Sequence, residues 1–441
     1  MGKIILMIAF AIIFILAAYN IITKSNQNKV KSIIRIGAFA LFVFLTLAWV
    51  IQWSFRWYGL GVLLLIWAML GVWTLISKKS NVNEYKAGHT VFNAIVSMLL
   101  VGMVVTPALI FPQSTLPKPT GKHEVATFTA TYTDNNRIET FSKTGGNRKV
   151  NVEFWFPKDS GNKYPLVVFS PGSFGTKGSN TSTFLELASN GYVVCSIDHP
   201  YHALVTSGAD GQMVTMDSSF IQEVTGANNG KYDESTTFKL EQKWMQLRTA
   251  DINFVLESVL AHAKEADSET VYQRIDPDKI GLMGHSLGGE SSAQVARERS
   301  DIGAVINLDA DLHGEYLEYV DGKYTLNEKV YPVPILTIFS DVMARLIAAV
   351  PNADTVVAVK HVTATAPKAF EVHLMGTDHM SLTDLPLISP FLVSIINASV
   401  PKGGGQEVDA YATIEKMNAI VLQFFDVYLK GEGNFTYNGT Y

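Results

Sequence analysis

The sequence predicts an α/β fold, a mostly parallel central sheet with helices on both faces, preceded by an all-α membrane segment. Three observations support this class. Four long apolar stretches occupy residues 1–111, short β-branched runs alternate with helix-like segments in the rest of the chain, and a serine flanked by glycines follows one of those runs. A length of 441 residues accommodates both parts and a short linker between them.

The four apolar stretches have the length and composition of transmembrane helices. Each is about 20 residues long and nearly free of charge, and they cover residues 4–22, 36–53, 57–76 and 91–111. The first could alternatively be a cleaved signal peptide, since Lys3 precedes it. Three further stretches of the same kind favour four membrane-spanning helices over residues 1–111.

Basic residues in the connections predict how this segment is oriented. The first and third connections are rich in them: Lys24, Lys29, Lys31 and Arg35 in the first, and Lys78, Lys79 and Lys86 in the third. The second connection has only Arg56. Because positively charged connections stay in the cytoplasm, we expect a multi-pass protein of the cell membrane whose N-terminus and large C-terminal domain are extracytoplasmic.

Charge argues against a nucleic-acid-binding protein, and cysteine content excludes a protein stabilised by intrachain disulfides. Residues 1–111 carry a net charge of +8, so the rest of the chain carries −13 at pH 7. A domain this acidic is a poor binder of nucleic acid, and we expect no nucleic-acid partner. Cys195 is the single cysteine, which excludes an intrachain disulfide, and its apolar surroundings predict a buried thiol.

A proline-rich linker at 112–121 leads to the large domain at 122–441. The domain opens with two runs of alternating apolar and polar residues, typical of antiparallel strands at a sheet edge, at 125–133 and 149–157. Six runs typical of buried strands follow at 164–172, 192–200, 279–286, 302–310, 333–341 and 370–378. Amphipathic segments between or after them lie at 181–191, 237–266, 287–300 and 410–431. This alternation predicts the parallel sheet.

One polar segment interrupts the alternation. Residues 201–235 are rich in Gly, Ser, Thr and Asn and lie between a strand and a helix. Insertions of this length are usually functional lids or disordered loops. We expect a cap over the site at about 201–235, with a disordered loop as the alternative.

Ser286 is the candidate nucleophile. It lies in Gly284-His285-Ser286-Leu287-Gly288, after an apolar strand and before a helix-forming segment. The pentapeptide alone arises often by chance, but strand, sharp turn and helix in this order are the context that a nucleophilic serine requires. His285 adjoins the serine in sequence and therefore points elsewhere, so we expect it to pack rather than to catalyse.

Two backbone amides are candidates for the oxyanion hole. One is Leu287, at the start of the helix that follows the serine. The other is Ser173, in the glycine-rich loop after the strand at 164–172, with Phe174 as the next choice. Ser173 lacks the sharp turn that a nucleophile needs.

Three histidines that follow the serine in the sequence are candidates for the base, and His379 is the preferred one. His373 lies within a strand pattern and His361 in a less ordered stretch, whereas His379 comes just after a strand, where an imidazole can reach the serine. The orienting acid is open between Asp309 and Asp341, both at strand ends, with Asp311 behind them.

At these residues the chain resembles the α/β-hydrolases, and within them the branch of platelet-activating-factor acetylhydrolases and lipases. The segments PLVVFSPG, DPDKIGLMGHSLGG, VINLDAD and GTDHMSLTD resemble that branch's oxyanion strand, nucleophile elbow, acid and histidine segments in the same order. The resemblance implies an α/β-hydrolase fold, Asp309 as the acid with Asp341 as the alternative, and Ser173 and Leu287 as oxyanion donors. The branch commonly has His-Gly where this chain has Pro171-Gly172.

These inferences predict a membrane-anchored serine hydrolase that cleaves carboxylic esters through an acyl-enzyme, with a lipid or other acyl ester as substrate and the bilayer as its partner. No metal or organic cofactor is needed for this chemistry, and no HExxH or cysteine cluster suggests one. The alternatives are a peptidase or an acyltransferase on the same triad, or an inactive hydrolase-like domain that acts as a binding or sensory module.

Overall fold

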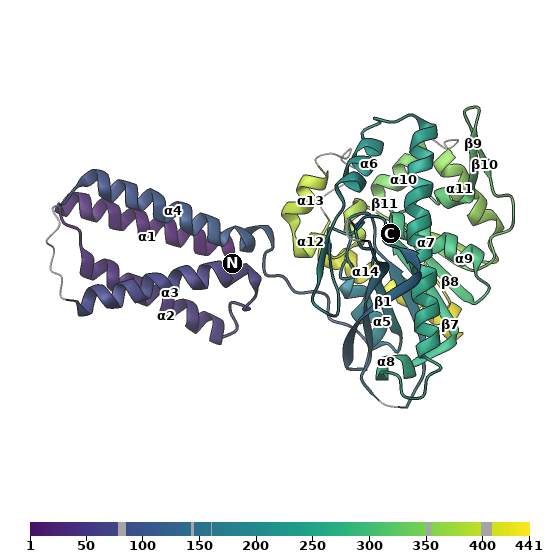
Figure 1. Cartoon of the computed structure of the whole chain (residues 1–441), viewed down its shortest axis with the longest axis horizontal. Coiled ribbons are helices and arrows are strands. Elements are labelled where there is room, and N and C mark those ends of the chain that lie inside the picture. The colour runs from purple at the N-terminus through teal and green to yellow at the C-terminus, as the bar shows by residue number, and fades with distance from the viewer. Residues whose placement is uncertain (78–84, 143–144, 160, 350–353, 398–407) are drawn as a thin grey trace. The chain divides into compact units, whose positions relative to one another are not determined.

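The computed structural model describes residues 1–77, 85–142, 145–159, 161–349, 354–397 and 408–441. The chain divides into two compact units (Figure 1). The first comprises Met1–Thr115 with Leu387–Ile396, and the second comprises Leu116–Pro386 with Asn397–Tyr441. The sequence predicts that residues 387–396 belong to the large domain, whereas their backbone contacts group them with the first unit.

Four helices form most of the first unit: α1 Gly2–Thr23, α2 Asn28–Leu47, α3 Phe55–Ile76 and α4 Ala87–Ile110. Each is long and apolar enough to cross a membrane. Helix α1 packs on α4, α2 packs on α3, and α3 also contacts α4 (Figure 1). A cluster of buried apolar side chains in this unit includes Trp57, Leu60, Val101 and Val105.

Helix α2 differs from its prediction of 36–53. It begins eight residues earlier, at Asn28, and ends at Leu47, shortly before Trp49 adopts a positive φ of 58°. The early start takes in basic residues of the predicted connection. Lysine and arginine are good helix formers, and their long side chains can hold the charge at the membrane surface while the backbone is already helical.

The second unit is built on a nine-stranded sheet. Its strands, in spatial order, are β1 Val125–Ile138, β2 Asn147–Pro157, β4 Val193–Asp198, β3 Tyr164–Ser170, β7 Ile275–His285, β8 Ile302–Leu308, β11 Ile335–Ser340, β12 Ala369–Leu374 and β13 Gly439–Thr440. The pairs β1–β2 and β2–β4 are antiparallel and all later pairs are parallel. This arrangement confirms the predicted mostly parallel sheet with an antiparallel edge.

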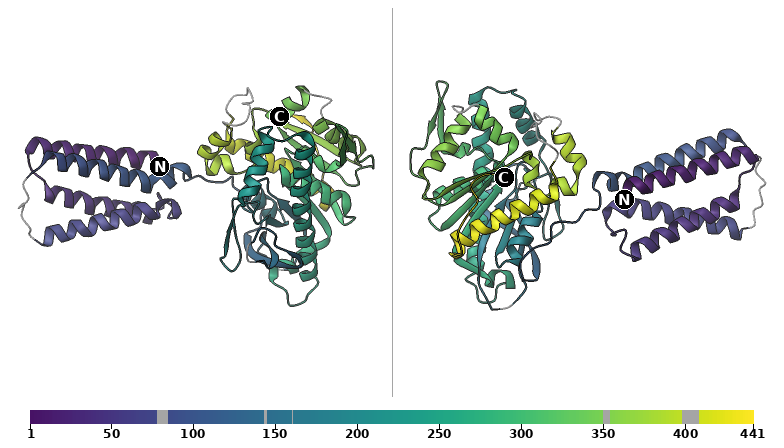
Figure 2. Two further views of the ribbon diagram at one scale, coloured as in Figure 1. Left: turned by 45° about the horizontal axis from the view of Figure 1, so that its top comes forward. Right: turned by 180° about the vertical axis from the view of Figure 1, so that it is seen from behind.

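Helices cover both faces of the sheet because its central strands are buried on both sides. In β3, Leu166 and Val168 belong to the core under α7 and α9, while Val167 and Phe169 belong to the core under α5 and α14. Figure 2 (right) shows α14, in yellow, lying across its face of the sheet. The covering helices are α5 Thr181–Ser189, α7 Glu234–His262, α9 Leu287–Glu298, α11 Asp354–Thr365 and α14 Ala410–Phe425.

Shorter elements complete the described chain. They are α8 Thr270–Gln273, β9 Tyr316–Val320, β10 Lys323–Leu326, α10 Asp341–Ala349, α12 Leu385–Ile388, α13 Pro390–Asn397 and a π-helical turn at Asp426–Lys430. Cys195 in β4 is fully buried, and burial raises the pKa of its thiol. The thiol is therefore protonated and unreactive at neutral pH.

The polar segment at 201–235 forms secondary structure. It contains the short strands β5 Val205–Ser207 and β6 Met213–Thr215 and the helix α6 Ser218–Asn228. Asp217 caps α6 by accepting from the N–H groups of Ser219 and Phe220. One face of the helix is buried: Phe220 and Val224 join a cluster with Trp244, Met245 and Leu287. The segment thus lies against the residue that follows Ser286, and the cap stays a prediction.

The end of the predicted linker is attached to the second unit. Thr120 donates a backbone hydrogen bond of 2.8 Å to the carboxylate of Glu186 on α5, and the N–H of Gly121 donates to the hydroxyl of Ser189 over 3.1 Å. These bonds hold the chain on the surface of α5 before the first strand begins.

Candidate active site

Ser286 stands on a strained turn between β7 and α9. Its φ is 54°, in the region that side chains rarely adopt, and its N–H donates to the carbonyl of Leu308 over 2.8 Å. The turn needs the flanking glycines: a Cβ on Gly284 would overlap the carbonyl of Gly288, and a Cβ on Gly288 would overlap the carbonyl of Ser170. The strand and the helix approach each other closely at this point, which is the geometry of a nucleophile elbow.

Asp309 and His379 are joined by a hydrogen bond. Nδ1 of His379 lies 2.8 Å from Oδ2 of Asp309, although 70 positions separate the two residues. Asp309 follows β8, and His379 begins a short 3₁₀ turn after β12. The carboxylate of Asp309 also accepts hydrogen bonds from the N–H and the hydroxyl of Ser340, over 2.6 and 2.9 Å. The acid is therefore held rigidly with one oxygen directed at the imidazole.

The environment stabilises the charged forms of this pair. Burial alone would lower the pKa of His379, but the hydrogen bond and the charge of Asp309 outweigh it and raise that pKa. Burial would conversely raise the pKa of Asp309, and its hydrogen bonds to His379 and Ser340 lower it. The His379 side chain remains 35% exposed, which leaves its other ring nitrogen accessible to a reacting group.

Asp341, the alternative acid, has other partners. Its carboxylate pairs with the guanidinium of Arg345 over 2.8 Å and accepts from the N–H of Gly376 over 3.1 Å. Within the described residues it has no hydrogen bond to a histidine. Asp311 lies 3.9 Å from His313. The structure brings Asp309, not Asp341 or Asp311, into hydrogen-bond contact with the candidate base.

The other two histidines lie elsewhere. His361 is in helix α11, so its stretch is helical rather than poorly ordered as the sequence suggested, and its Nε2 lies 3.3 Å from the carbonyl of Lys329. His373 lies within β12, as expected, with its ring against that of Phe339.

His285 is buried beside the candidate base. Its Nε2 lies 2.8 Å from the backbone carbonyl oxygen of His379, and the two rings are 4.5 Å apart. Burial lowers the pKa of His285 to about 3, so the ring is neutral. The expected packing role is therefore accompanied by a hydrogen bond that the sequence does not reveal.

The predicted oxyanion loop lies next to Ser286. A Cβ on Gly172 would lie 3.1 Å from the Cβ of Ser286, so the backbone of the loop passes directly beside the serine. The N–H of Phe174 is already bonded to the carbonyl of His202 over 3.0 Å. No hydrogen bond uses the N–H of Ser173 or of Leu287 among the described residues. The N–H groups of Ser173 and Leu287 are thus free to donate to an oxyanion, whereas the N–H of Phe174 is already used.

Arg248 holds the same loop from behind. This fully buried residue of α7 donates from Nη1 to the carbonyl of Pro171 and from Nη2, over 3.1 Å, to the carbonyl of Gly172. Burial lowers its pKa to about 9, which still leaves the guanidinium charged at neutral pH. Two parallel hydrogen bonds from one planar group fix the orientation of the peptide units that precede Ser173.

Asp251, one turn further along α7, is the centre of a second buried network. Its carboxylate pairs with Arg148 of β2 over 2.6 Å and with Arg137 of β1 over 2.8 Å. It also contacts Nδ1 of His199 over 2.9 Å, and Nε2 of His199 lies 2.9 Å from the hydroxyl of Ser170. Ser170 directly precedes Pro171, so this network supports the base of the oxyanion loop.

Sequence patterns did not predict the contacts of Arg248, Asp251 or His199. One signal was available: Arg248 and Asp251 are charged residues within an amphipathic helix, spaced three positions apart and therefore on one face. Whether this face is buried depends on how α7 packs against the sheet, which the spacing does not reveal.

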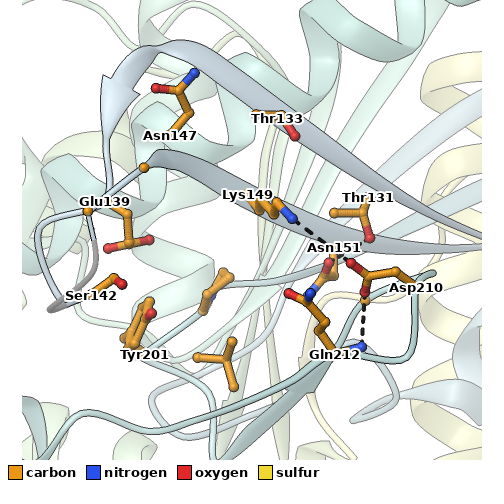
Figure 3. Close-up of a pocket in the computed structure, with 15 residues that line it drawn as sticks. Thr131, Thr133, Glu139, Ser142, Asn147, Lys149, Asn151, Tyr201, Asp210 and Gln212 are labelled. Atoms are coloured by element: carbon orange, nitrogen blue, oxygen red, sulfur yellow. Dashed lines mark hydrogen bonds and ion pairs between the residues drawn. The ribbon is translucent and has the colours of Figure 1, made fainter.

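A separate cavity of about 460 Å³ lies between the β1–β2 edge and the β5–β6 segment (Figure 3). Its lining is mostly polar: Thr131, Thr133, Glu139, Ser142, Asn147, Lys149, Asn151, Tyr201, Asp210 and Gln212. Nζ of Lys149 lies 3.9 Å from Asp210, whose carboxylate also accepts from the N–H of Gln212 over 2.9 Å. Ser286, Asp309 and His379 do not line this cavity.

The sheet, the covering helices and the serine elbow define an α/β-hydrolase. The model of the family described as platelet-activating factor acetylhydrolase, isoform II, matches residues 114–439, which is most of the chain. The protein belongs to this family, as the resemblance of its motifs predicted.

Individual relatives match shorter regions. The platelet-activating factor acetylhydrolase of Canis lupus familiaris is 30% identical over 171 residues, which are 35% of this chain and 36% of that protein. Cutinase est1 of Thermobifida alba is 26% identical over 170 residues, 38% and 43% of the two chains. The chain therefore spans well under half of the length of these curated relatives.

A solved structure supports the fold over a longer region. A ferulic acid esterase from Streptomyces cinnamoneus superposes with a TM-score of 0.55 and 21% identity, covering 72% of this chain and 94% of that one. At this identity the likeness establishes the fold alone.

Proposed function

We propose that the protein is a membrane-anchored serine hydrolase that cleaves carboxylic esters, with Ser286, His379 and Asp309 as its catalytic triad. The hydrogen bond between His379 and Asp309, on a segment bonded through His285 to the strained turn that carries Ser286, is the observation that carries the proposal. The relatives named acetylhydrolase and cutinase support ester cleavage as the reaction class.

In this mechanism Oγ of Ser286 attacks the carbonyl carbon of the ester, and Nε2 of His379 takes the hydroxyl proton. Asp309 accepts from Nδ1, which fixes the tautomer and stabilises the imidazolium that forms. The N–H groups of Ser173 and Leu287 donate to the developing oxyanion. His379 then returns the proton to the departing alcohol. In the second half of the reaction His379 takes a proton from water, the water attacks the acyl-enzyme, and the proton returns to Oγ of Ser286.

The insertion that carries α6 is suited to a cap over the acyl side of this site. Phe220 of α6 packs with the side chain of Leu287, one proposed oxyanion donor, and with Phe174, which follows the other donor; the ring centroids of Phe174 and Phe220 are 5.5 Å apart. An apolar surface at this place favours the acyl part of a lipid or other acyl ester over a charged group.

The four apolar helices are proposed to anchor the enzyme. Their length and hydropathy suit a bilayer, and the basic connections favour an orientation in which residues 1–111 cross the membrane four times and the hydrolase domain is extracytoplasmic. Resistance of the full chain to carbonate extraction, together with protease access to the hydrolase domain only from the outer side, would test this part separately.

The chemistry is tested with the full chain in detergent. We expect a fluorophosphonate probe to label Ser286 and the protein to hydrolyse p-nitrophenyl esters, with both signals lost in Ser286→Ala. A folded wild-type protein that gives no adduct would favour the inactive binding or sensory module. Cleavage of peptides but not of esters would favour the peptidase, and product formation that depends on an added alcohol acceptor would favour the acyltransferase.

A further inference from the structure

The four-helix unit contains a cavity of about 730 Å³ that is unrelated to the serine. It is lined by residues of all four helices. Helix α1 packs chiefly on α4 and α2 chiefly on α3 (Figure 1). The lining residues place the cavity between these two helix pairs. Its volume is in the range of small-molecule and cofactor sites, roughly 300–1,000 Å³.

The lining is polar at one end and apolar elsewhere. The polar side chains come from the end of α1 and from the N-terminal halves of α2 and α4: Asn20, Lys31, Arg35, Thr90, Asn93 and Ser97. These helix ends lie at the same side of the unit because successive helices alternate in direction. The rest of the lining consists of aliphatic and aromatic side chains and one glycine.

Two cationic side chains lie at the polar end. Lys31 and Arg35 both line it, and residues 1–77 and 85–111 contain no carboxylate side chain to neutralise them. Asn20 adds a second observation: it is 1% exposed, and its side-chain oxygen has no hydrogen-bond partner in the described chain. Lys31 and Arg35 favour an anionic ligand, and the unpaired oxygen of Asn20, which can only accept, favours a ligand that also carries a hydroxyl donor.

The apolar part has the length of a lipid tail. Along α1 it extends from Ile5 to Ala17, about 18 Å at 1.5 Å per residue. One leaflet of a bilayer provides half of a hydrocarbon core of about 30 Å, or roughly 15 Å. A soluble phosphate would satisfy the cations and leave this surface uncovered, whereas a phospholipid would fill both parts.

We propose that the membrane unit binds one anionic glycerophospholipid, with its phosphate at Lys31 and Arg35 and one acyl chain along α1 and α2. Basic pockets between transmembrane helices are a general means of binding anionic headgroups. The inference rests on the proposed membrane insertion and not on catalysis. In the proposed orientation the headgroup lies at the cytoplasmic surface, on the side opposite to Ser286, so this lipid is a bound component rather than the substrate.

The experiment compares retention of added lipids by the delipidated full chain in native mass spectrometry. We expect phosphatidylglycerol to be retained about tenfold more than phosphatidylcholine by the wild type. The double variant Lys31→Gln, Arg35→Gln should lose this preference. Lys29→Gln is the matched control, because Lys29 is an exposed basic residue of the same helix that does not line the cavity. Equal retention of the two lipids, or a preference that survives in the double variant, would overturn the proposal.

A second arm separates a lipid from a free phosphate. Ala38→Trp fills the apolar part and leaves both cations in place, so it should reduce phosphatidylglycerol retention at least as strongly as the double variant. Ala40→Trp, on an exposed position of α2 outside the cavity, serves as its control. Glycerol 3-phosphate should not displace the lipid. If glycerol 3-phosphate displaces it, or if Ala38→Trp retains it, the site binds a phosphate and not a lipid. Two controls accompany every variant. Fluorophosphonate labelling of Ser286 verifies folding, and carbonate extraction verifies membrane insertion, so that misfolding or failed insertion is distinguished from loss of lipid binding.

Discussion

Nε2 of His285 donates a hydrogen bond of 2.8 Å to the backbone carbonyl oxygen of His379. A carbonyl can only accept, so the proton of this neutral ring must be on Nε2. The bond joins the elbow that carries Ser286 to the segment that carries the proposed base, although these segments are 94 positions apart. It therefore limits how far the base can move from the serine.

Replacing His285 should impair catalysis without weakening substrate binding. His285→Phe keeps a ring in the buried space but removes the donor, and misplacement of the base by a fraction of an ångström should lower kcat by about 10- to 100-fold with little change in KM. His285→Gln, whose amide can donate, should recover part of the loss. Steady-state kinetics on a p-nitrophenyl ester measures both; equal losses in the two variants would show that the hydrogen bond is not the cause.

The choice of acid is tested by a pair of matched substitutions. Asp309→Asn should lower kcat by as much as about 10⁴-fold, because an amide at this position favours the wrong tautomer of His379. Asp341→Asn removes a carboxylate that pairs with the half-exposed Arg345 and should change kcat by less than about tenfold. The kcat values of both variants decide the matter, and the reverse order of losses would move the acid to Asp341.

The pH dependence of kcat/KM should follow the titration of His379. The base must be neutral to accept the serine proton, and Asp309 raises its pKa above the usual 6.5. Activity should therefore fall as the pH falls through a value above 6.5. In Asp309→Asn this raising interaction is lost, so the residual activity should persist to lower pH. A pH–rate profile of wild type and variant provides the measurement, and an acid limb that shifts upward in the variant contradicts the assignment.

Arg248 should act as a positioning residue for the oxyanion loop. Arg248→Met removes both hydrogen bonds to the carbonyls of Pro171 and Gly172, which should loosen the Ser173 amide and lower kcat by up to about 100-fold, with KM nearly unchanged. Loss of one buried charge need not destabilise the protein, so thermal unfolding is recorded in parallel.

Arg299→Met is the control for this substitution. Arg299 pairs with Asp301 near the surface, away from the loop, and its removal should leave kcat unchanged. If Arg248→Met reduces the melting temperature but not kcat of the folded protein, the clamp has only a structural role.

The fold was predictable because its signals are local. Alternation in the first two strands, continuous apolar runs in the next six and glycines around Ser286 each report on a few neighbouring residues. The boundaries of α2 were not predictable in this way, since charged residues beside an apolar stretch indicate a connection whether or not they are helical. The same limit applied to His361, whose segment is helix α11.

The candidate site was only partly accessible from the sequence. Pattern alone left Asp309 and Asp341 equal, because both end a strand, and the resemblance to relatives favoured Asp309. The structure adds the hydrogen bond from His379 to Asp309 and the pairing of Asp341 with Arg345. The contacts of His285 and Arg248 were inaccessible, since each joins segments whose proximity depends on the sheet order.

The position of Asp251 determines where a soluble fragment of this enzyme can begin. Two of its cations, Arg137 and Arg148, belong to β1 and β2, so a protein that started after this hairpin would bury a carboxylate without them, at a cost of about 3–5 kcal/mol. The hairpin is thus part of the smallest unit able to fold. Because Thr120 and Gly121 are also bonded to α5, the cleavage point that separates catalyst from anchor should lie no later than Leu116.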